Sequence, residues 1–422
     1  MTRRRKALLA LLAIFALLAA ACGSSDNSAE DAENAIDDTV EEETESQEPD
    51  ESEVAAQDEQ PDEVVEGEVE SEFRAAFILV APVGDVGLNF QHDLGRQGAD
   101  VATGIETAFV DSVPEGGSEF DDAVQNFIDD GFNVIVTTWS GYQDATLQFA
   151  NDNPDVTFEN ISGSLTNETN MGNTNGRMYQ PRYIAGMAAG AATESDVIGY
   201  VAAFPIPEVI RGINAFALGV QATNPDAVVE VDWTSTWFGI PEETASAQSL
   251  IDAGADVLTM HQDSTATGIA ISEAGGTFIG YHSDMSAQVE NYLTAPVWDF
   301  TPRYTEIIET VLSNTYTPEL WWGGMADGIV DIEIPESSPV AAEMQEVKDS
   351  ILAGEFDVFD QGDVIGQDGT VIISDGVVQT ELTDPFAPDV VVAAEGDALN
   401  DGVLLTMNYF VENVVGAPSL DG

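Results

Sequence analysis

Aromatic and polar residues that could hold a small molecule occur together at several places along this 422-residue chain. Each group directly follows a short run of apolar residues. Aromatic rings can stack on the flat face of a heterocycle, while carboxylate and amide groups hydrogen-bond to its edge. The sequence therefore predicts a binding site for a flat, polar heterocycle. Its candidate ligand-binding residues are Asn89, Phe90, Gln91, Trp139, Tyr142, Phe204, Trp237, Phe238, Asp263, His282 and Asp284.

The three histidines of the chain, His92, His261 and His282, each precede an aspartate by one or two positions. Histidine and aspartate are zinc ligands, but no two of these histidines have the His-x-x-x-His spacing that puts two ligands on one helix face. We therefore expect no metal. Asp263 has a second interpretation, because an aspartate just before a helix near residue 265 could cap that helix.

Two common catalytic motifs are not found in the sequence, which has neither a Gly-x-Ser-x-Gly nucleophile elbow nor a P-loop. We expect a binding protein with no catalytic residues and no cofactor. The enzymatic alternative is a secreted nucleoside hydrolase, which needs a carboxylate-rich cluster after the first strand. Only Asp85 and Asp93 lie there, which argues against this alternative.

The apolar runs before the candidate residues alternate with helical patterns, and this alternation predicts an α/β fold. A first series has predicted strands at 75–82, 133–138 and 156–161, and a second series has them at 197–202, 227–233, 256–260 and 277–280. Two such series predict two doubly wound parallel-sheet lobes. Ligands of doubly wound sheets bind beyond the carboxyl ends of the strands, so we expect a ligand cleft between the lobes.

The first 72 residues read as export and tethering segments. Four bases, Arg3 to Lys6, precede an uncharged apolar run at 7–21 that is short for a membrane span, and this pattern is typical of a secretory signal. The lone Cys22 ends this run in a context that resembles the lipobox of bacterial lipoproteins, which predicts a lipidated, membrane-anchored protein; the alternative is an ordinary buried cysteine. The composition of residues 23–72, with many acids and few large apolar residues, predicts a disordered acidic tether.

The predicted domains follow from these patterns. Residues 1–22 form the signal peptide and lipobox, and 23–72 the tether. Residues 73–195 with about 300–325 form an N-terminal lobe, and 196–299 with about 326–354 a C-terminal lobe. The role of the extension at 355–422 is left open.

The charge of the chain excludes several partners. It has 77 acidic and 11 basic residues, for a net charge of −66. Phosphate groups bind to clustered Lys and Arg, so nucleic acid is excluded as a partner. The acids remain in excess after residue 72, which suggests a folded surface adapted to a salty exterior. A single cysteine excludes a disulfide framework.

Residues 75–331 resemble the basic membrane protein family of ABC-transporter substrate-binding lipoproteins. The resemblance rests on these motifs: Tyr179-x-x-x-Tyr183-x-x-Gly186-x-x-Ala189-Gly190, Ile198-Gly199-Tyr200, Gly212-x-x-x-Phe216-x-x-Gly219, Asn224-Pro225 and Gly254-Ala255-Asp256-Val257. It implies the type I periplasmic-binding-protein fold and delivery of a purine nucleoside or base to an ABC permease and its ATPase. Residues 204–216 resemble a subgroup associated with free purine bases such as adenine.

The resemblance also implies roles for single residues. Leu88 stands where nucleoside binders have a stacking Phe, and neighbouring Phe90 could replace it; Trp237 or Phe238 matches the second stacking aromatic. His282 replaces the first aspartate of the ribose clamp, and Asp284 remains. This incomplete clamp favours a base over a nucleoside. The alternatives are another small polar heterocycle or a sugar as ligand, or a ligand-sensing receptor module of the same fold.

Overall fold

The computed structural model describes residues 73–84, 86–385 and 387–416. The predicted signal peptide, Cys22 and the acidic tether lie outside the described residues and stay predictions.

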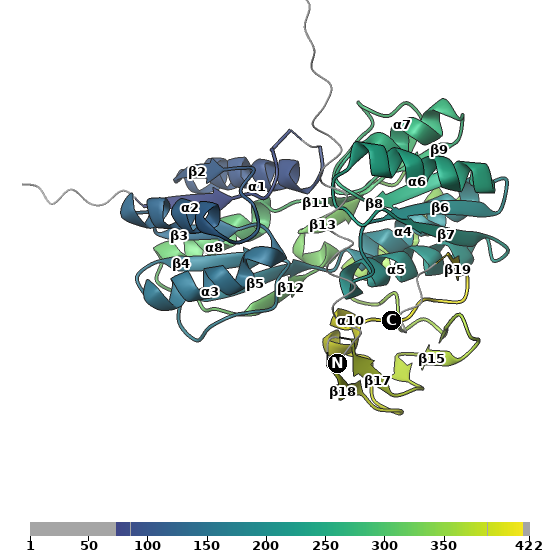
Figure 1. Ribbon diagram of the computed structural model, residues 1–422. Coiled ribbons are helices and arrows are strands. Elements are labelled where there is room, and N and C mark those ends of the chain that lie inside the picture. The colour runs from purple at the N-terminus through teal and green to yellow at the C-terminus, as the bar shows by residue number, and fades with distance from the viewer. Residues whose placement is uncertain (1–72, 85, 386, 417–422) are drawn as a thin grey trace, which may run out of the picture. The chain divides into compact units, whose positions relative to one another are not determined.

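The first sheet consists of six parallel strands in the order β12-β5-β4-β3-β1-β2 (Figure 1). Its central strands β1 and β3 are apolar runs buried almost throughout, as expected of a sheet covered by helices. The strands are β1 (Arg74–Ile78), β2 (Glu106–Val110), β3 (Val134–Thr137), β4 (Thr157–Ile161), β5 (Met171–Gly176) and β12 (Leu320–Gly323). The helices of this lobe are α1 (Leu88–Thr103), α2 (Ser118–Asp129), α3 (Gln143–Asp152) and α8 (Thr301–Leu312).

The second sheet has the order β10-β9-β8-β6-β7-β19 and is also parallel. Its strands are β6 (Val197–Ala202), β7 (Val228–Trp233), β8 (Val257–His261), β9 (Thr277–Ile279), β10 (Tyr292–Thr294) and β19 (Val414–Val415). The helices are α4 (Tyr179–Ala192), α5 (Pro207–Thr223), α6 (Ile240–Ala253), α7 (Ala266–Glu273) and α9 (Ala341–Leu352). Two parallel sheets with helices confirm the predicted fold class, whereas the domain boundaries stay a prediction.

The chain passes between the two sheets three times. Residues 177–178 join β5 to α4, β11 (Pro296–Trp298) leads into α8, and residues 324–329 lead from β12 to β13 (Val330–Ile332). β11 and β13 pair as an antiparallel ladder with Val297 opposite Asp331. Any movement of one lobe against the other would have to bend these crossing segments.

The glycines of α4 and α5 that belong to the motifs quoted above allow these two helices to touch. A Cβ atom on Gly186 would overlap the carbonyl oxygen of Phe216, and one on Gly219 would overlap that of Tyr183. Only hydrogen atoms fit between the backbones, so the small-residue motifs define the closest helix contact of this lobe.

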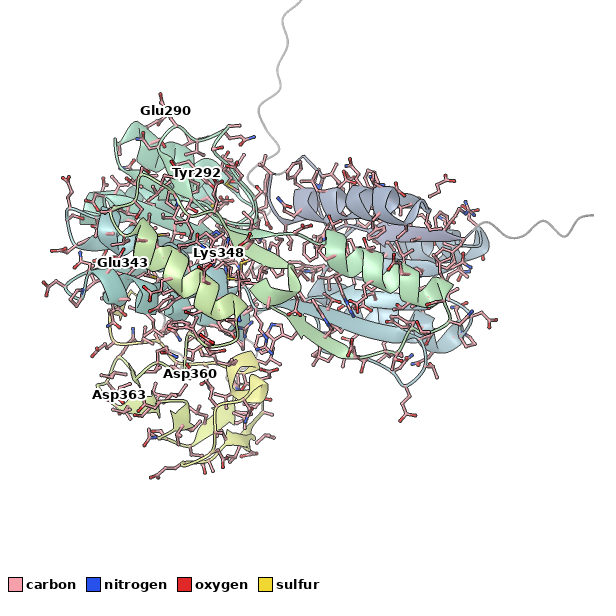
Figure 2. The ribbon with its side chains drawn as sticks, turned by 180° about the vertical axis from the view of Figure 1, so that it is seen from behind. Glu290, Tyr292, Glu343, Lys348, Asp360 and Asp363 are labelled. Carbon is pink, nitrogen blue, oxygen red and sulfur yellow. The ribbon has the colours of Figure 1, made fainter. Side chains whose placement is uncertain are left out.

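Lys348 of α9 is the sole lysine among the described residues. Its Nζ donates to the carbonyl of Ile332 at 2.7 Å and pairs with Asp331 Oδ1 at 2.6 Å, which fastens α9 to β13. Figure 2 shows Lys348 beside Glu343 on a face that also carries Asp360 and Asp363. The base thus forms contacts within the protein, although its partner Asp331 is more than half exposed.

The C-terminal extension packs onto the second lobe and completes its sheet. It contains β14 (Asp363–Ile365), β15 (Val371–Ser374), β16 (Val377–Val378), β17 (Leu382–Asp384), β18 (Ala387–Ala393) and α10 (Asp401–Leu405) before β19 pairs with β7. Asn214 of α5 is fully buried; its Nδ2 donates to the carbonyl of Tyr409 at 2.7 Å, and the Val411 N–H donates to its Oδ1 at 3.1 Å. The Arg211 guanidinium donates to the carbonyl of Leu404 at 2.7 Å.

We predict that Asn214→Ala destabilises the protein by about 2–4 kcal/mol, because it leaves a buried N–H and a buried C=O of the extension without their partner. Guanidinium denaturation measures this change in the free energy of unfolding. The control Gln345→Ala removes an exposed side chain whose amide donates to Asp349, and it should change stability by less than about 0.5 kcal/mol. Equal stabilities of the two variants would contradict the prediction.

Candidate ligand-binding site

Loops from the carboxyl ends of both sheets contact each other, and the candidate residues gather there. The backbone N–H of Leu88, at the start of α1, donates to Asp263 Oδ1 at 3.3 Å. The Ser283 hydroxyl donates to the carbonyl of Val86. Asp263 and Ser283 follow β8 and β9, whereas Val86 and Leu88 follow β1. These hydrogen bonds therefore join the two lobes.

Three of the predicted aromatic residues meet at this contact. The Trp237 ring lies 5.2 Å from that of Trp139, at an angle of 81°, and 5.2 Å from that of Phe204. Trp139 follows β3 of the first sheet, while Phe204 and Trp237 follow β6 and β7 of the second. The Trp139 indole N–H donates to Glu115. Both lobes thus contribute an aromatic face to one place.

Asp263 and His282 form a second, polar part of the site. His282 Nε2 lies 3.1 Å from Asp263 Oδ1, and the Trp298 indole N–H donates to His282 Nδ1 at 3.1 Å. Because Nδ1 accepts, the imidazole proton belongs on Nε2, where it is donated to the carboxylate. His282 has a left-handed backbone with φ of 69°, a conformation that costs energy in a residue with a side chain.

The structure gives Asp263 a different role from the helix cap considered above. α7 begins at Ala266 after Thr265 and has no side-chain cap. The carboxylate of Asp263 instead accepts from Leu88 and His282, and its backbone N–H donates to the carbonyl of Trp237 at 3.1 Å. One residue therefore connects the aromatic part of the site with the polar part.

The first lobe contributes a buried polar group from α1. Asn89 is almost fully buried, and its Oδ1 accepts from the Ala81 N–H at 3.3 Å. His92, one turn later, stacks on Phe300 at 4.1 Å, and its Nδ1 lies 2.7 Å from the Tyr304 hydroxyl. Burial, with a smaller effect of His282, lowers the pKa of His92 to about 3, so this imidazole is neutral at pH 7.

Other predicted residues lie elsewhere or less centrally. Tyr142 is buried in the core of the first lobe, where it stacks on Phe120 and its hydroxyl donates to the carbonyl of Val113. Asp284 accepts from the Ser286 N–H in a turn. Phe90 and Gln91 are partly buried on α1, and Phe238 is half exposed. A ligand-binding role for all eleven candidate residues, these five included, stays a prediction.

Several residues at the site were not among the sequence-based candidates. The His261 ring lies 6.0 Å from that of Trp237, Tyr281 packs on His282, and Ser283 and Trp298 donate hydrogen bonds to Val86 and His282. The aspartate two positions after His261 was the available signal for this histidine. In the described part of the chain no group of three His, Cys, Asp or Glu residues is arranged to hold a metal ion.

Two α/β lobes whose strand-end loops bring aromatic and polar side chains together define a two-lobed solute-binding protein. The chain belongs to the Bmp family, described as ABC transporter substrate-binding protein PnrA-like, which matches residues 73–359. This confirms the predicted resemblance and makes the chain an extracytoplasmic substrate-binding protein of an ABC transporter, in a family without enzymatic function. In the part of the chain that the structure describes, no helix is long and apolar enough to cross a membrane.

Two relatives are similar over most of their length. A purine-binding protein of Brucella abortus is 33% identical over 82% of this chain and 93% of its own. A candidate ABC transporter glucose-binding protein of Haloferax volcanii is 41% identical over 67% of this chain and 71% of its own. Among solved structures, a solute-binding protein of an ABC transporter system from Conexibacter woesei has a TM-score of 0.58 at 18% identity, covering 68% of this chain and 98% of that one. That structure supports the fold.

We predict that His92→Gln weakens the acid sensitivity of the protein. The folded-state pKa of His92 lies below the ordinary value of 6.5, so the unfolded chain binds an extra proton between pH 6.5 and about 3, and stability falls as the pH is lowered through this window. Between pH 7 and pH 5 the free energy of unfolding should fall by about 2 kcal/mol less in the variant than in the wild type.

Guanidinium denaturation at both pH values measures this difference. Gln97→Ala, on an exposed part of the same helix, serves as the control and should keep the wild-type pH dependence. If His92→Gln keeps it as well, His92 does not titrate as the structure indicates.

Proposed function

We propose that this protein captures a purine base or nucleoside, with the base favoured, and delivers it to the permease and ATPase of its ABC transporter. The observation that carries the proposal is the meeting of Trp139, Phe204 and Trp237 beside the Asp263–His282 pair. Aromatic faces suit a flat heterocycle, and a carboxylate suits its N–H edge. The Brucella abortus relative named as purine-binding supports the same ligand class.

The hydrogen bonds of His282 support a base over a nucleoside. Nucleoside binders of this family use an aspartate at the corresponding position, and a carboxylate can accept hydrogen bonds from ribose hydroxyls. Here Nε2 of His282 is paired with Asp263 and Nδ1 accepts from Trp298. Both ring nitrogens are engaged, so His282 offers no acceptor to a ribose.

A hexose such as glucose is the second candidate ligand. It is favoured by the 41% identical Haloferax volcanii relative, whose name refers to glucose. The rings of Trp139, Phe204 and Trp237 could also pack on the apolar face of a sugar ring. A sugar needs several hydrogen-bonding partners around its ring, whereas a purine base relies more on its flat faces. The affinities for the two ligands therefore distinguish the two candidates.

The mechanism of the proposed capture is closure of the two lobes around the ligand. Loops of both lobes are in direct contact in the structure, so a ligand can enter only when the lobes separate. Bending at the crossing segments would open the site, and ligand contacts with both lobes would favour the closed form. Binding and closure involve no chemical step.

We also propose that Cys22 carries a lipid anchor and that residues 23–72 tether the folded part to the outer face of the cell membrane. The sequence pattern of residues 1–22 supports this. The acidic surface supports adaptation to a salty exterior, since salt screens repulsion between like charges.

We predict that Trp237→Ala raises the dissociation constant for adenine at least about tenfold, because it removes the central stacking surface. Calorimetric titration of adenine, inosine and glucose measures the affinities. Phe109→Ala is the control, since Phe109 is a partly exposed ring on β2 and its loss should leave binding within about twofold. Tighter binding of inosine than adenine would overturn the preference for a base, and binding of glucose alone would replace the purine proposal.

We predict that Gly87→Ala weakens ligand binding by an indirect effect, without a contact between the new methyl group and the ligand. A Cβ on Gly87 would lie 2.9 Å from the carbonyl oxygen of Asp263 and 3.0 Å from its Oδ1, so the closed lobes would have to move apart. An affinity loss of about tenfold corresponds to about 1.4 kcal/mol of disfavoured closure. Small-angle X-ray scattering with saturating ligand should show a larger radius of gyration than in the wild type.

Gly84→Ala is a matched control for this variant. A Cβ on Gly84 would meet nothing within 4 Å, so affinity and radius should remain those of the wild type. Equal affinities of the two alanine variants would show that contact between these loops is not part of the bound form.

A further inference from the structure

Arg182 of α4 is a fully buried cation that forms no ion pair with any residue the structure describes. Its Nη1 donates to the carbonyl of Met260 at 2.9 Å, and its guanidinium lies 3.6 Å from the centre of the Tyr281 ring. Nε and Nη2 have no acceptor among the described residues. A buried charge without a counter-charge is costly.

Two further buried polar atoms that have no hydrogen-bond partner in the described part of the chain lie next to Arg182. They are the hydroxyl of Tyr200 on β6 and Nδ1 of His261 on β8. All three side chains converge on Gly212 of α5. A Cβ atom on Gly212 would have as its nearest neighbours Arg182 Nε at 3.7 Å, His261 Nδ1 at 3.8 Å and the Tyr200 hydroxyl at 3.8 Å.

The groups that face Gly212 can all act as hydrogen-bond donors. Burial lowers the pKa of His261 well below its usual value, and the nearby Arg182 adds to this, so the imidazole is neutral. Its Nε2 lies 3.4 Å from the Tyr281 hydroxyl. When that hydroxyl donates to Nε2, the imidazole proton is on Nδ1 and points towards Gly212. Burial raises the pKa of Tyr200 to about 12, which keeps its proton.

We propose that Arg182, Tyr200 and His261 bind a small monovalent anion, such as chloride, in the space beside Gly212. The N–H groups of Arg182, the O–H of Tyr200 and the Nδ1–H of His261 are its ligands. The anion supplies an acceptor for these donors and a counter-charge for Arg182, which pairs with no carboxylate of the described residues. The nearby Glu208 acts electrostatically on Tyr200 and Tyr281 but forms no ion pair with Arg182.

A water molecule fits this site less well than an anion. Water could accept from two of the donors, but its own two hydrogens would need acceptors, and the guanidinium would keep its uncompensated charge. The ligand of the cleft is also a poor candidate, because Arg182 and Tyr200 are fully buried and His261 is 4% exposed. Of the three side chains, His261 is the one that also contacts the candidate ligand-binding residues, with its ring centre 6.0 Å from that of Trp237.

Thermal unfolding in chloride and gluconate salts of equal ionic strength tests the proposal, since equal ionic strength holds charge screening constant. The wild type should melt several degrees higher in chloride, with a gain that grows with chloride concentration. Gly212→Ala should lose this gain. Its methyl group makes only ordinary contacts and suits a helix better than glycine, so a structural effect alone would raise its melting temperature in both salts.

Two tyrosine variants provide a matched pair. Tyr200→Phe removes one donor and should weaken the apparent chloride affinity several-fold, whereas Tyr142→Phe removes a buried hydroxyl in the first lobe and should keep the full chloride gain. Crystals grown in bromide should show an anomalous peak in contact with Arg182, Tyr200 and His261. Equal melting temperatures of the wild type in the two salts, or water in place of bromide beside Gly212, would overturn the proposal.

Discussion

The candidate site depends on the hydrogen bonds that the Asp263 carboxylate accepts. It accepts from the Leu88 N–H of the first lobe and pairs with His282 of its own lobe. His282 in turn accepts from the indole of Trp298 in β11, one of the segments that cross between the lobes. A single chain of hydrogen bonds therefore runs from the start of α1 to the crossing segment β11. Separation of the lobes would break the Leu88 bond at one end of that chain, so the proposed closure would be linked to the position of β11.

Helix α5 braces the second lobe through several contacts. Small residues let α5 lie against α4, Asn214 holds the C-terminal extension, and Gly212 leaves space next to Arg182. The extension then returns to the sheet as β19, beside β7. Because β7 leads directly to the loop of Trp237, bracing of this sheet edge holds the loop that carries an aromatic residue of the proposed site. The chain beyond α9 is thus part of the fold that supports this loop.

The sequence predicted the elements whose residues have one clear pattern. The apolar runs at β1, β3, β6 and β8 are too hydrophobic to lie anywhere but in a covered sheet, and they fixed the α/β class. β5, with the sequence MGNTNG, was missed because its asparagines look like turn residues. In the structure Asn173 donates to Asn160 and Asn175 to the carbonyl of Gly163, so these amides are satisfied by tertiary partners. The two-residue strand β19 pairs with Val229 far away in sequence, and no local pattern could reveal that. The same limit applies to the candidate site. The strand ends pointed to Trp237 and Asp263, which contact the other lobe in the structure, but only packing shows that Tyr142 turns into the core.

The contacts of the few basic residues in the folded part bear on whether nucleic acid could be a partner. Each of the seven makes a contact within the described structure: Arg74 with Asp130, Arg96 with Asp93, Arg177 with Asp401, Arg182 with Met260, Arg211 with Leu404, Arg303 with Glu159 and Lys348 with Asp331. A surface for nucleic acid needs bases that face solvent in groups, and these bases are spent on internal structure. The acids that outnumber them therefore set the field outside the protein, whereas the proposed recognition depends on groups that both lobes bury. The surrounding negative field would have little effect on the capture of a neutral base or sugar at such a site. The net charge of the protein therefore does not determine which ligand it binds.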